Sequence, residues 1–351
     1  MTTFPDLIRD GWERTRRFRP VLFLLIVMIP VFAILQGAFL TQQNLESMLV
    51  NSAVLWIVAM GMTFVLLSGG FDLSVAAIAA LAGIFMAKML QQGIPGGIVL
   101  VLAVLVGVLV GGLVNGLLIG RGGLSVFVVT LASMISLSGV VDLWSSSESF
   151  YVYAPVAKII GTDDFLGIPT AIWIMAGVFL AALYVQSRTF FGRDVYAIGG
   201  NPVAARLAGI RVPGTLIAIY ALMGGCAGLA GVVAVGRIGA AVPQVNNTLP
   251  LEAIAAVLLG GTALSGGSGG VGGTALGVLF IAVLDNRLAI SGVSNDWQNI
   301  VTGIILVVAV ASDRLRFRRA EKGADLGAGS DPDSEGAEQS PVPADRSPLV
   351  T

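Results

Sequence analysis

Long apolar runs, separated by short polar or glycine-containing stretches, dominate the chain from residue 21 to residue 312. A helix that spans a membrane needs about 20 mainly apolar residues. Ten runs approach this length, at residues 21–40, 47–68, 73–91, 97–119, 124–143, 170–186, 213–236, 249–264, 271–290 and 297–312. The pattern predicts an all-α membrane protein, a polytopic bundle of about ten transmembrane helices. Glycine clusters interrupt the eighth and ninth runs, so eight or nine helices remain alternatives.

Lysine and arginine residues are distributed unevenly over the two sides that ten spans define. With the N-terminus in the cytosol, fifteen of them fall on the cytosolic side, against four (Lys88, Lys158, Arg237 and Arg287) on the outer side. The positive-inside rule requires this bias. We therefore expect ten spans with both termini in the cytosol: a cytosolic segment over residues 1–20 and a transmembrane domain over residues 21–312.

Composition supports the membrane assignment. Hydrophobic residues make up 56% of the 351 positions and charged residues 12%, whereas soluble domains carry about 25% charged residues. After Ala320 the chain holds seven acidic and two basic residues among Gly, Ser and Pro. Such a segment lacks the apolar content for a core, so residues 320–351 are predicted to be a disordered acidic cytosolic tail.

The residue types present exclude several classes of chemistry. The chain has no histidine and one cysteine, Cys226, so we expect no disulfide framework, no metal site and no Ser-His-Asp triad. A phosphate-binding loop needs lysine directly after glycine, and none of the three lysines follows a glycine. We expect no catalytic site, no cofactor in this chain and no nucleic-acid partner, with membrane lipid as its surroundings.

The segment over residues 187–212 is the longest predicted cytosolic connection between spans. Asn201 followed by Pro202 is typical of a helix start, because Asn caps free N–H groups and Pro suits the first helical position. Gly209 favours a left-handed stop about two turns later. A short, small-residue helix, with Ala204 and Ala205 on it, would suit docking to another protein. The alternative is a basic connector that only sets the topology.

Polar residues within or beside the apolar runs are candidates for a solute pathway. Ionisable groups at membrane depth are costly and tend to be functional or paired. The tentative pathway set is Asp72, Ser74, Asn115, Glu252, Asn286 and Gln298. For Asp72 the alternative is a cap that accepts N–H groups at the start of the next helix together with Ser74. Glu252 has the same alternative, since it follows Pro250 at the start of a span.

Repeated and glycine-rich segments add weaker indications. The sequence Ala-Ile-Ala-Ala occurs at residues 77–80 and 253–256, in spans of opposite direction, which makes an inverted repeat a possible feature of the fold. The run at residues 266–273 contains a nominal dinucleotide-binding pattern without a preceding strand, so we interpret it as an inner turn and a candidate hinge. Glycines four residues apart, such as Gly107/Gly111 and Gly224/Gly228, would permit close helix contact within the chain or in a dimer.

Four separated blocks resemble the permeases of ribose-type sugar ABC importers, the second carbohydrate-uptake family. The blocks are 61–75 (GMTFVLLSGGFDLSV), 192–210 (GRDVYAIGGNPVAARLAGI), 252–274 (EAIAAVLLGGTALSGGSGGVGGT) and 284–298 (LDNRLAISGVSNDWQ). The resemblance covers residues 44–314. It implies that the cytosolic segment is the coupling helix that contacts the ATPase. The residues that would carry this coupling are Gly199, Asn201, Pro202, Ala204, Ala205, Arg206 and Gly209.

The resemblance also implies an assembly and a location. The partners would be an ABC ATPase subunit that uses the ATP, a periplasmic solute-binding protein and a second permease subunit, identical or different, in a bacterial inner membrane. The expected function is passage of a sugar or sugar-like solute to the cytosol. The alternatives are an ion-coupled secondary transporter, or an ABC permease for nucleosides or branched-chain amino acids. Asp285 and Arg287 depart from the commoner family pattern, and an Asp–Arg pair there would affect gating or solute preference.

Overall fold

Helices account for most of the computed structural model, which describes residues 19–244, 248–294 and 296–311. Six helices in this described part are long and apolar enough to cross a membrane: α3 (Gln42–Leu67), the continuous helix Gly96–Gly120, α7 (Val126–Ser145), α9 (Thr170–Arg188), α12 (Val212–Ile238) and α14 (Val271–Ile290). The shorter apolar helices are α2 (Arg19–Leu35), α4 (Val75–Gln91), α13 (Leu249–Leu259) and Asp296–Ala311. The predicted all-α membrane class is confirmed. Six of the ten predicted spans fall on the long helices and four on the shorter ones, so the count of about ten spans stays a prediction.

The remaining elements are short. Helix Gly96–Gly120 consists of α5 (Gly96–Leu109), a π-helical turn (Val110–Gly116) and α6 (Leu117–Gly120). Helices α8 (Pro155–Gly161), α10 (Phe190–Gly200) and α11 (Pro202–Leu207) lie between the long ones. The two-residue strands form antiparallel pairs, β1 (Phe150–Tyr151) with β4 (Ala240–Ala241) and β2 (Asp164–Phe165) with β3 (Ile168–Pro169). Phe150 lies opposite Ala241, so β1 and β4 join the segment after α7 to the end of α12.

Residues 1–18 and the acidic tail at 320–351 lie outside the described residues. The chain up to Val310 forms one unit, which contains the helix bundle. A second unit begins at Ala311, its first and only described residue.

Two helices end earlier than the sequence predicted. The first span was expected to reach residue 40, but α2 ends at Leu35. The eighth was expected to reach residue 264, but α13 ends at Leu259 and the chain turns at Gly261, whose φ is +85°. Apolar composition continues through both turns, so hydropathy alone overestimates the helix length.

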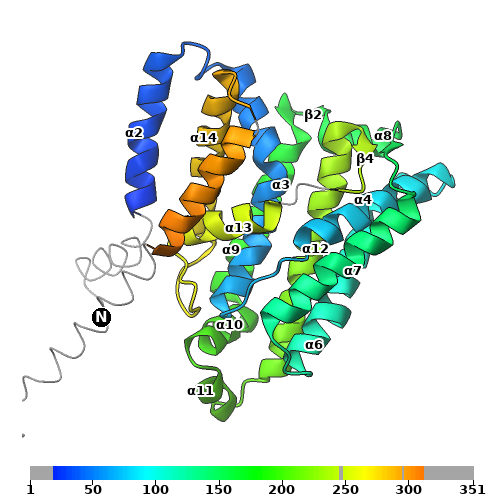
Figure 1. Ribbon diagram of the computed structural model, residues 1–351, viewed down its shortest axis with the longest axis vertical. Helices are drawn as coiled ribbons and strands as arrows, with labels where there is room; N and C mark the ends of the chain where they lie inside the picture. The colour runs from blue at the N-terminus through cyan, green and yellow to red at the C-terminus, as the bar shows by residue number, and fades with distance from the viewer. Residues whose placement is uncertain (1–18, 245–247, 295, 312–351) are drawn as a thin grey trace, which may run out of the picture. The chain divides into compact units, whose positions relative to one another are not determined.

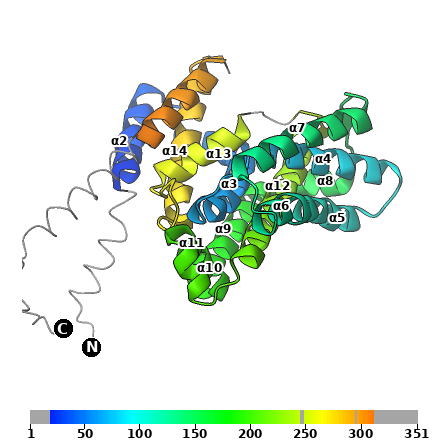
Figure 2. The ribbon, with the colours of Figure 1, turned by 60° about the horizontal axis from the view of Figure 1, so that its bottom comes forward.

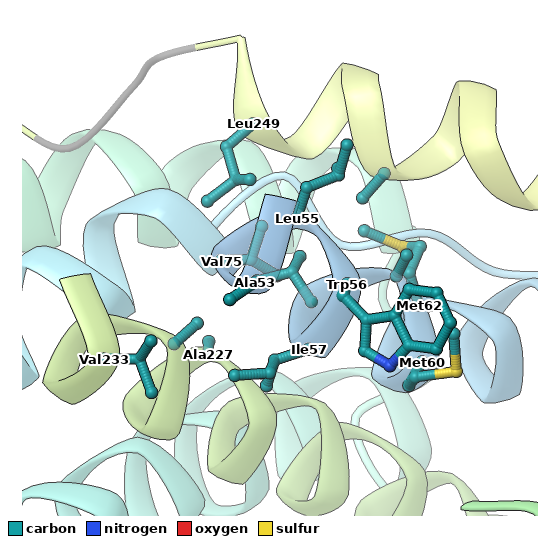
Figure 3. Close-up of a cluster of buried hydrophobic side chains, with 14 of the residues drawn as sticks. Ala53, Leu55, Trp56, Ile57, Met60, Met62, Val75, Ala227, Val233 and Leu249 are labelled. Carbon is teal, nitrogen blue, oxygen red and sulfur yellow. The ribbon is translucent and has the colours of Figure 1, made fainter. Parts of the chain in front are cut away.

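Helices α3 and α12 form the centre of the bundle (Figure 1). In α3, 78% of the most apolar stretch is buried, against 11% in α9. Helix α3 packs against α9, α12, α13 and α14. Figure 3 shows Ala53 and Ile57 of α3 among Ala227 and Val233 of α12, with Leu249 of α13 above them. Trp56 extends this core to α9, because its indole N–H donates to the carbonyl of Met175 at 3.1 Å.

Glycines set the distance between α12 and helix Gly96–Gly120. A Cβ atom on Gly107 would lie 2.2 Å from the carbonyl oxygen of Gly224, and one on Gly111 would lie 2.2 Å from that of Tyr220. Both distances are far below van der Waals contact, so these positions admit only hydrogen. The glycine pairs that the sequence left open between dimerisation and internal packing therefore serve internal packing here.

Candidate functional site

Helices α10 and α11, with the residues up to 210, form a bent projection that we call the elbow (residues 190–210). Figures 1 and 2 show α10 and α11 beside each other at one end of the bundle. The start of α11 is fixed as the sequence predicted. Asn201 accepts hydrogen bonds from the backbone N–H groups of Val203 and Ala204, both at 3.0 Å, and Pro202 occupies the first helical position.

The end of α11 also follows the local sequence. Gly209 has a φ of +86°, and its N–H donates to the carbonyl of Arg206 at 3.0 Å. The N–H of Ile210 donates to the carbonyl of Ala205 at 3.1 Å. Together these two bonds make a Schellman motif, the usual glycine stop of a helix. With both ends closed by hydrogen bonds, α11 is a short and well-defined helix.

The exposed face of α11 differs from the one that the sequence suggested. Ala205 was expected among the contact residues, but it is 4% exposed and packs in a small cluster with Ile198 and Val212. Its side chain therefore anchors α11 to the rest of the chain and is not available to a partner in this structure. The apolar side chains that do face outward are Val203, which is 67% exposed, and Leu207, which is 84% exposed. Ala204 and Arg206 are exposed as well.

Sequence reasoning missed α10, the longer helix of the elbow. The signals for it are present. Thr189 accepts a hydrogen bond from the N–H of Gly192 at 3.1 Å, which caps the helix start. The apolar residues Phe191, Val195 and Ile198 recur at helical spacing and face the protein. The basic, glycine-containing composition of the segment obscured this pattern.

Glycines from three distant parts of the chain meet at the base of the elbow. The N–H of Gly267 donates to the carbonyl of Leu67 at 2.9 Å. A Cβ on Gly199 would lie 1.8 Å from the carbonyl oxygen of Leu67, and one on Gly266 would lie 2.8 Å from the backbone nitrogen of Gly69. We call this contact of Gly69, Gly199, Gly266 and Gly267 the glycine junction. It joins the elbow to the α3–α4 connection and to the predicted inner turn before α14.

Three of the six predicted pathway residues lie together in a buried polar network. Asp72 is completely buried, and one carboxylate oxygen accepts the backbone N–H of Ser74 at 2.8 Å and its hydroxyl at 2.6 Å. Asn115 donates to the second oxygen at 3.3 Å and to the Ser74 hydroxyl at 2.8 Å. Ser133 in turn donates to the Asn115 carbonyl oxygen at 2.6 Å.

This network fixes the turn that leads into α4 and connects it to two further helices. The carboxylate satisfies an N–H at the residue just before α4, and the π-helical turn presents Asn115 to it. Ser133 adds α7. Since an unsatisfied buried donor costs about 1–3 kcal/mol, the network stabilises one arrangement of the α3–α4 connection, the π-helical turn and α7.

The other three predicted pathway residues line a separate cavity of about 610 Å³, which we call the polar cavity. It lies between α3, α12, α13, α14 and the helix Asp296–Ala311. Its lining in the described part of the chain is Met48, Asn51, Ser52, Leu55, Arg237, Glu252, Ala282, Asp285, Asn286, Ala289, Gln298, Asn299 and Thr302. Asp72, Ser74 and Asn115 are not among these residues, so the tentative pathway set divides into a network and a cavity.

Four polar side chains at the cavity are held in place by hydrogen bonds to neighbouring groups. Arg237 donates to the backbone carbonyl of Asn51 at 2.7 Å. Asn286 and Asn44 exchange amide hydrogen bonds of 3.0 and 3.1 Å. Gln298 donates to the carbonyl of Val293 at 3.0 Å. The hydroxyl of Thr248, the residue before α13, donates a hydrogen bond to the carboxylate of Glu252. The cavity therefore presents ordered amide and charged groups to whatever occupies it.

Asp285 and Arg287 do not form the pair that the sequence suggested. Asp285 lines the polar cavity, whereas the Arg287 guanidinium lies 5.8 Å from the centre of the Phe32 ring and donates to Ser291. Residues two apart in a helix point in nearly opposite directions, which explains the separation. Arg237 and Asp285 are the charged residues of the cavity that the pathway prediction missed.

Apolar helices packed around a polar cavity, with the elbow at one end, define a polytopic membrane protein. The chain belongs to the family described as "Branched-chain amino acid transport system / permease component", whose model matches residues 44–310. The match covers all four sequence blocks, the elbow and every lining residue of the cavity.

Several curated relatives are similar over most of their length. The ribose import permease protein RbsC of Escherichia coli K12 is 38% identical over 299 residues, which are 84% of this chain and 93% of the relative. The same protein of Bacillus subtilis is 39% identical over 84% of this chain and 91% of its own. The D-allose permease AlsC of E. coli K12 is 34% identical over 87% and 92%. The resemblance to ribose-type importer permeases is confirmed. No solved structure matches this chain.

Proposed function

We propose that this chain is the membrane-spanning permease subunit of an ABC importer for a sugar or sugar-like solute. The observation that carries the proposal is the similarity to importer permeases for ribose and allose over more than four fifths of each chain. The polar cavity supports the same solute class, because ordered amides and carboxylates suit hydroxyl groups. A branched aliphatic side chain would need an apolar pocket instead.

Transport energy in this proposal comes from separate ATPase subunits. A phosphate-binding loop contains lysine directly after glycine, and this chain has no such pair. ATP would therefore be hydrolysed by a partner subunit, which docks on the elbow. Val203 and Leu207 offer two exposed apolar side chains on a short helix with fixed ends, which suits insertion into a groove. The full assembly would contain two permeases, two ATPases and a periplasmic binding protein that delivers the solute.

Reconstitution tests the function directly. The permease would be purified together with an ABC ATPase and a solute-binding protein from the same organism and placed in liposomes. We expect uptake of labelled ribose, allose or xylose that requires ATP on the elbow side and the binding protein on the other. Leucine is the control solute for the amino-acid alternative. Sugar uptake by the permease alone, driven by an ion gradient, would contradict the proposal.

We further propose ten membrane crossings with both termini in the cytosol. Fifteen basic residues on the cytosolic side, against four on the outer side, support this orientation. At about 1.5 Å per residue, the 11 residues of α13 are too short for a bilayer core of about 30 Å. The residues after α13 complete the crossing in non-helical form. Gly260, Gly261 and Thr262 are buried there, which satisfies the condition for irregular backbone at membrane depth.

Cysteine labelling checks this topology. In a Cys226→Ala background, Ser149→Cys on the predicted outer segment should react with a membrane-impermeant maleimide in intact spheroplasts. Ala204→Cys on α11 should react only after the membrane is opened. Both positions are exposed in the structure, so burial does not limit either reaction. Labelling of Ala204→Cys in intact spheroplasts would place the elbow on the outer face and contradict the proposal.

The polar cavity is the part of the pathway that we propose contacts solute, and the Asp72 network is the matched contrast. Replacing Asp285 with Asn keeps the shape but exchanges a carboxyl group for an amide at the cavity wall, so we expect the KM for uptake to change by about 3- to 10-fold with unchanged thermal stability. Replacing Asp72 with Asn sets an amide N–H₂ against that of Asn115. We expect this variant to lose thermal stability while its order of preferred solutes stays the same.

These two variants separate pathway from structure. Uptake kinetics would be measured for three sugars, and unfolding would be followed in detergent. An altered order of solute preference in Asp72→Asn would mean that Asp72 contacts the solute. Unaltered uptake kinetics in Asp285→Asn would mean that this wall of the cavity does not.

A further inference from the structure

Two side chains connect the elbow to the start of α14. The phenol of Tyr196, on α10, donates to the carbonyl of Gly269 at 2.7 Å. The same phenol oxygen accepts a hydrogen bond from the side-chain amide of Gln186, near the end of α9, at 2.7 Å. Both side chains are half-buried. A single hydroxyl group thus lies between the elbow, α9 and the glycine-rich turn.

Gln186 completes the connection to α14. Its carbonyl oxygen accepts the backbone N–H of Val271, the first residue of α14, at 2.7 Å. A Cβ on Gly270 would lie 2.4 Å from the Gln186 amide nitrogen, so the amide lies directly against the turn. Gln186 therefore occupies the position of a helix cap supplied by a distant part of the chain.

The turn before α14 depends on glycine. Gly266, Gly267 and Gly269 have φ values of +86°, +70° and +124°, a region that glycine adopts without the steric cost of a side chain. The helix that follows is continuous for 20 residues, or about 30 Å. Its far part supplies Ala282, Asp285, Asn286 and Ala289 to the polar cavity.

We propose that the Tyr196–Gln186 pair is the link through which displacement of the elbow reaches α14 and, through it, the polar cavity. The inference rests on the proposed function, since it needs a partner that moves the elbow. Tyr196 and Gln186 are positioning residues. They hold the first turn of α14 to α10, so that α10 and α14 move together about the glycine-rich turn. The cavity wall at Asp285 then shifts whenever the elbow does.

The glycine junction is the competing route. It joins the same elbow to the same turn by backbone contact at Gly199, Gly266 and Gly267. If backbone contact alone carried the motion, loss of the Tyr196 hydroxyl would have no effect on coupling. The two routes are therefore separable by removing one oxygen atom.

The test uses the complete reconstituted importer and three variants: Tyr196→Phe, Gln186→Met, and the two combined. Phe keeps the ring and Met keeps the side-chain volume, while both remove the hydrogen bonds. We expect each variant to co-purify with the ATPase and to hydrolyse ATP within about twofold of the unmodified complex. We expect sugar transported per ATP to fall about fivefold, the loss of one or two hydrogen bonds from the coupled state. The double variant should be no worse than the more impaired single one, because residues of one link are not additive.

Tyr184→Phe is the matched control. Tyr184 lies on α9 two residues before Gln186 and is 63% exposed, so its variant should transport as the unmodified complex does. Three results would overturn the link: an unchanged transport-to-ATP ratio in Tyr196→Phe, additive losses in the double variant, or loss of ATPase co-purification. Absence of ATP-driven uptake in the unmodified complex would contradict the proposed function instead, so the two failures are distinguishable.

Discussion

Replacing Leu207 with Asp should abolish ATP-dependent uptake and separate the permease from its ATPase. Leu207 is 84% exposed on α11, so the substitution disturbs no internal packing. In the complex the same side chain would be buried against the partner. A carboxylate at this position would lose its hydration there and would have no positive charge to pair with, which is unfavourable. Apolar anchors of this kind are worth about 2 kcal/mol or more, which corresponds to about a 30-fold loss of affinity.

Co-purification of the ATPase with tagged permease measures this effect, with uptake as the second readout. Leu166→Asp is the matched control, because Leu166 is 78% exposed in the segment that we assign to the outer face. It should retain the ATPase. Equal retention by Leu207→Asp would exclude α11 as the docking helix. The variant Ala205→Asp does not serve this purpose, since Ala205 is buried and a charge there would unfold the elbow itself.

Replacing Gly199 with Ala should prevent the elbow from seating on the bundle. The added Cβ would lie 1.8 Å from the carbonyl oxygen of Leu67 and 2.5 Å from the backbone nitrogen of Gly267. Both neighbours are backbone atoms, so no side chain can rotate away and α10 must move. Overpacking of a rigid site costs about 1–3 kcal/mol, occasionally more. We expect the midpoint of thermal unfolding in detergent to fall by about 5 °C or more and uptake to be lost.

Gly200→Ala provides a control one residue away on the same helix. A Cβ on Gly200 meets no atom within 4 Å, and alanine favours helix over glycine by about 0.5–1 kcal/mol. This variant should match the unmodified protein or be slightly more stable. A similar loss in both variants would mean that general damage to α10, and not the contact with Leu67, explains the result.

Short-range signals in the sequence were sufficient for the elements that depend only on their own residues. The apolar runs predicted the helices because each buries a lipid-facing or core-facing stretch of about 20 residues. Asn201, Pro202 and Gly209 predicted α11 because capping involves backbone groups two to five residues away. The helix ends at Leu35 and Leu259 were missed because apolar residues resume shortly after each of them, at 38–40 and 263–264, which keeps the mean hydropathy high.

Contacts between distant segments were not readable in the same way. The spacing of Gly107 and Gly224 indicated close helix contact, but only the folded chain shows that these two glycines meet each other. Asp72 was suspected of capping, yet its bonds to Asn115, and through Asn115 to Ser133, needed the π-helical turn and α7 to be in place. The polar cavity likewise collects Arg237, Asp285 and Gln298 from three helices.

The sequence by itself determined the membrane class, the apolar helices, the short helix α11 of the elbow and the family. Tertiary structure decided which way each of these elements faces: Ala205 inward, Leu207 outward, Asp285 and Arg287 apart, and Tyr196 between α9 and α14. The physical reason is the distance along the chain over which each interaction acts. Hydropathy and capping act over a few residues and leave a local pattern. The partner of a side chain is fixed by packing among helices that can lie a hundred residues or more apart in the sequence.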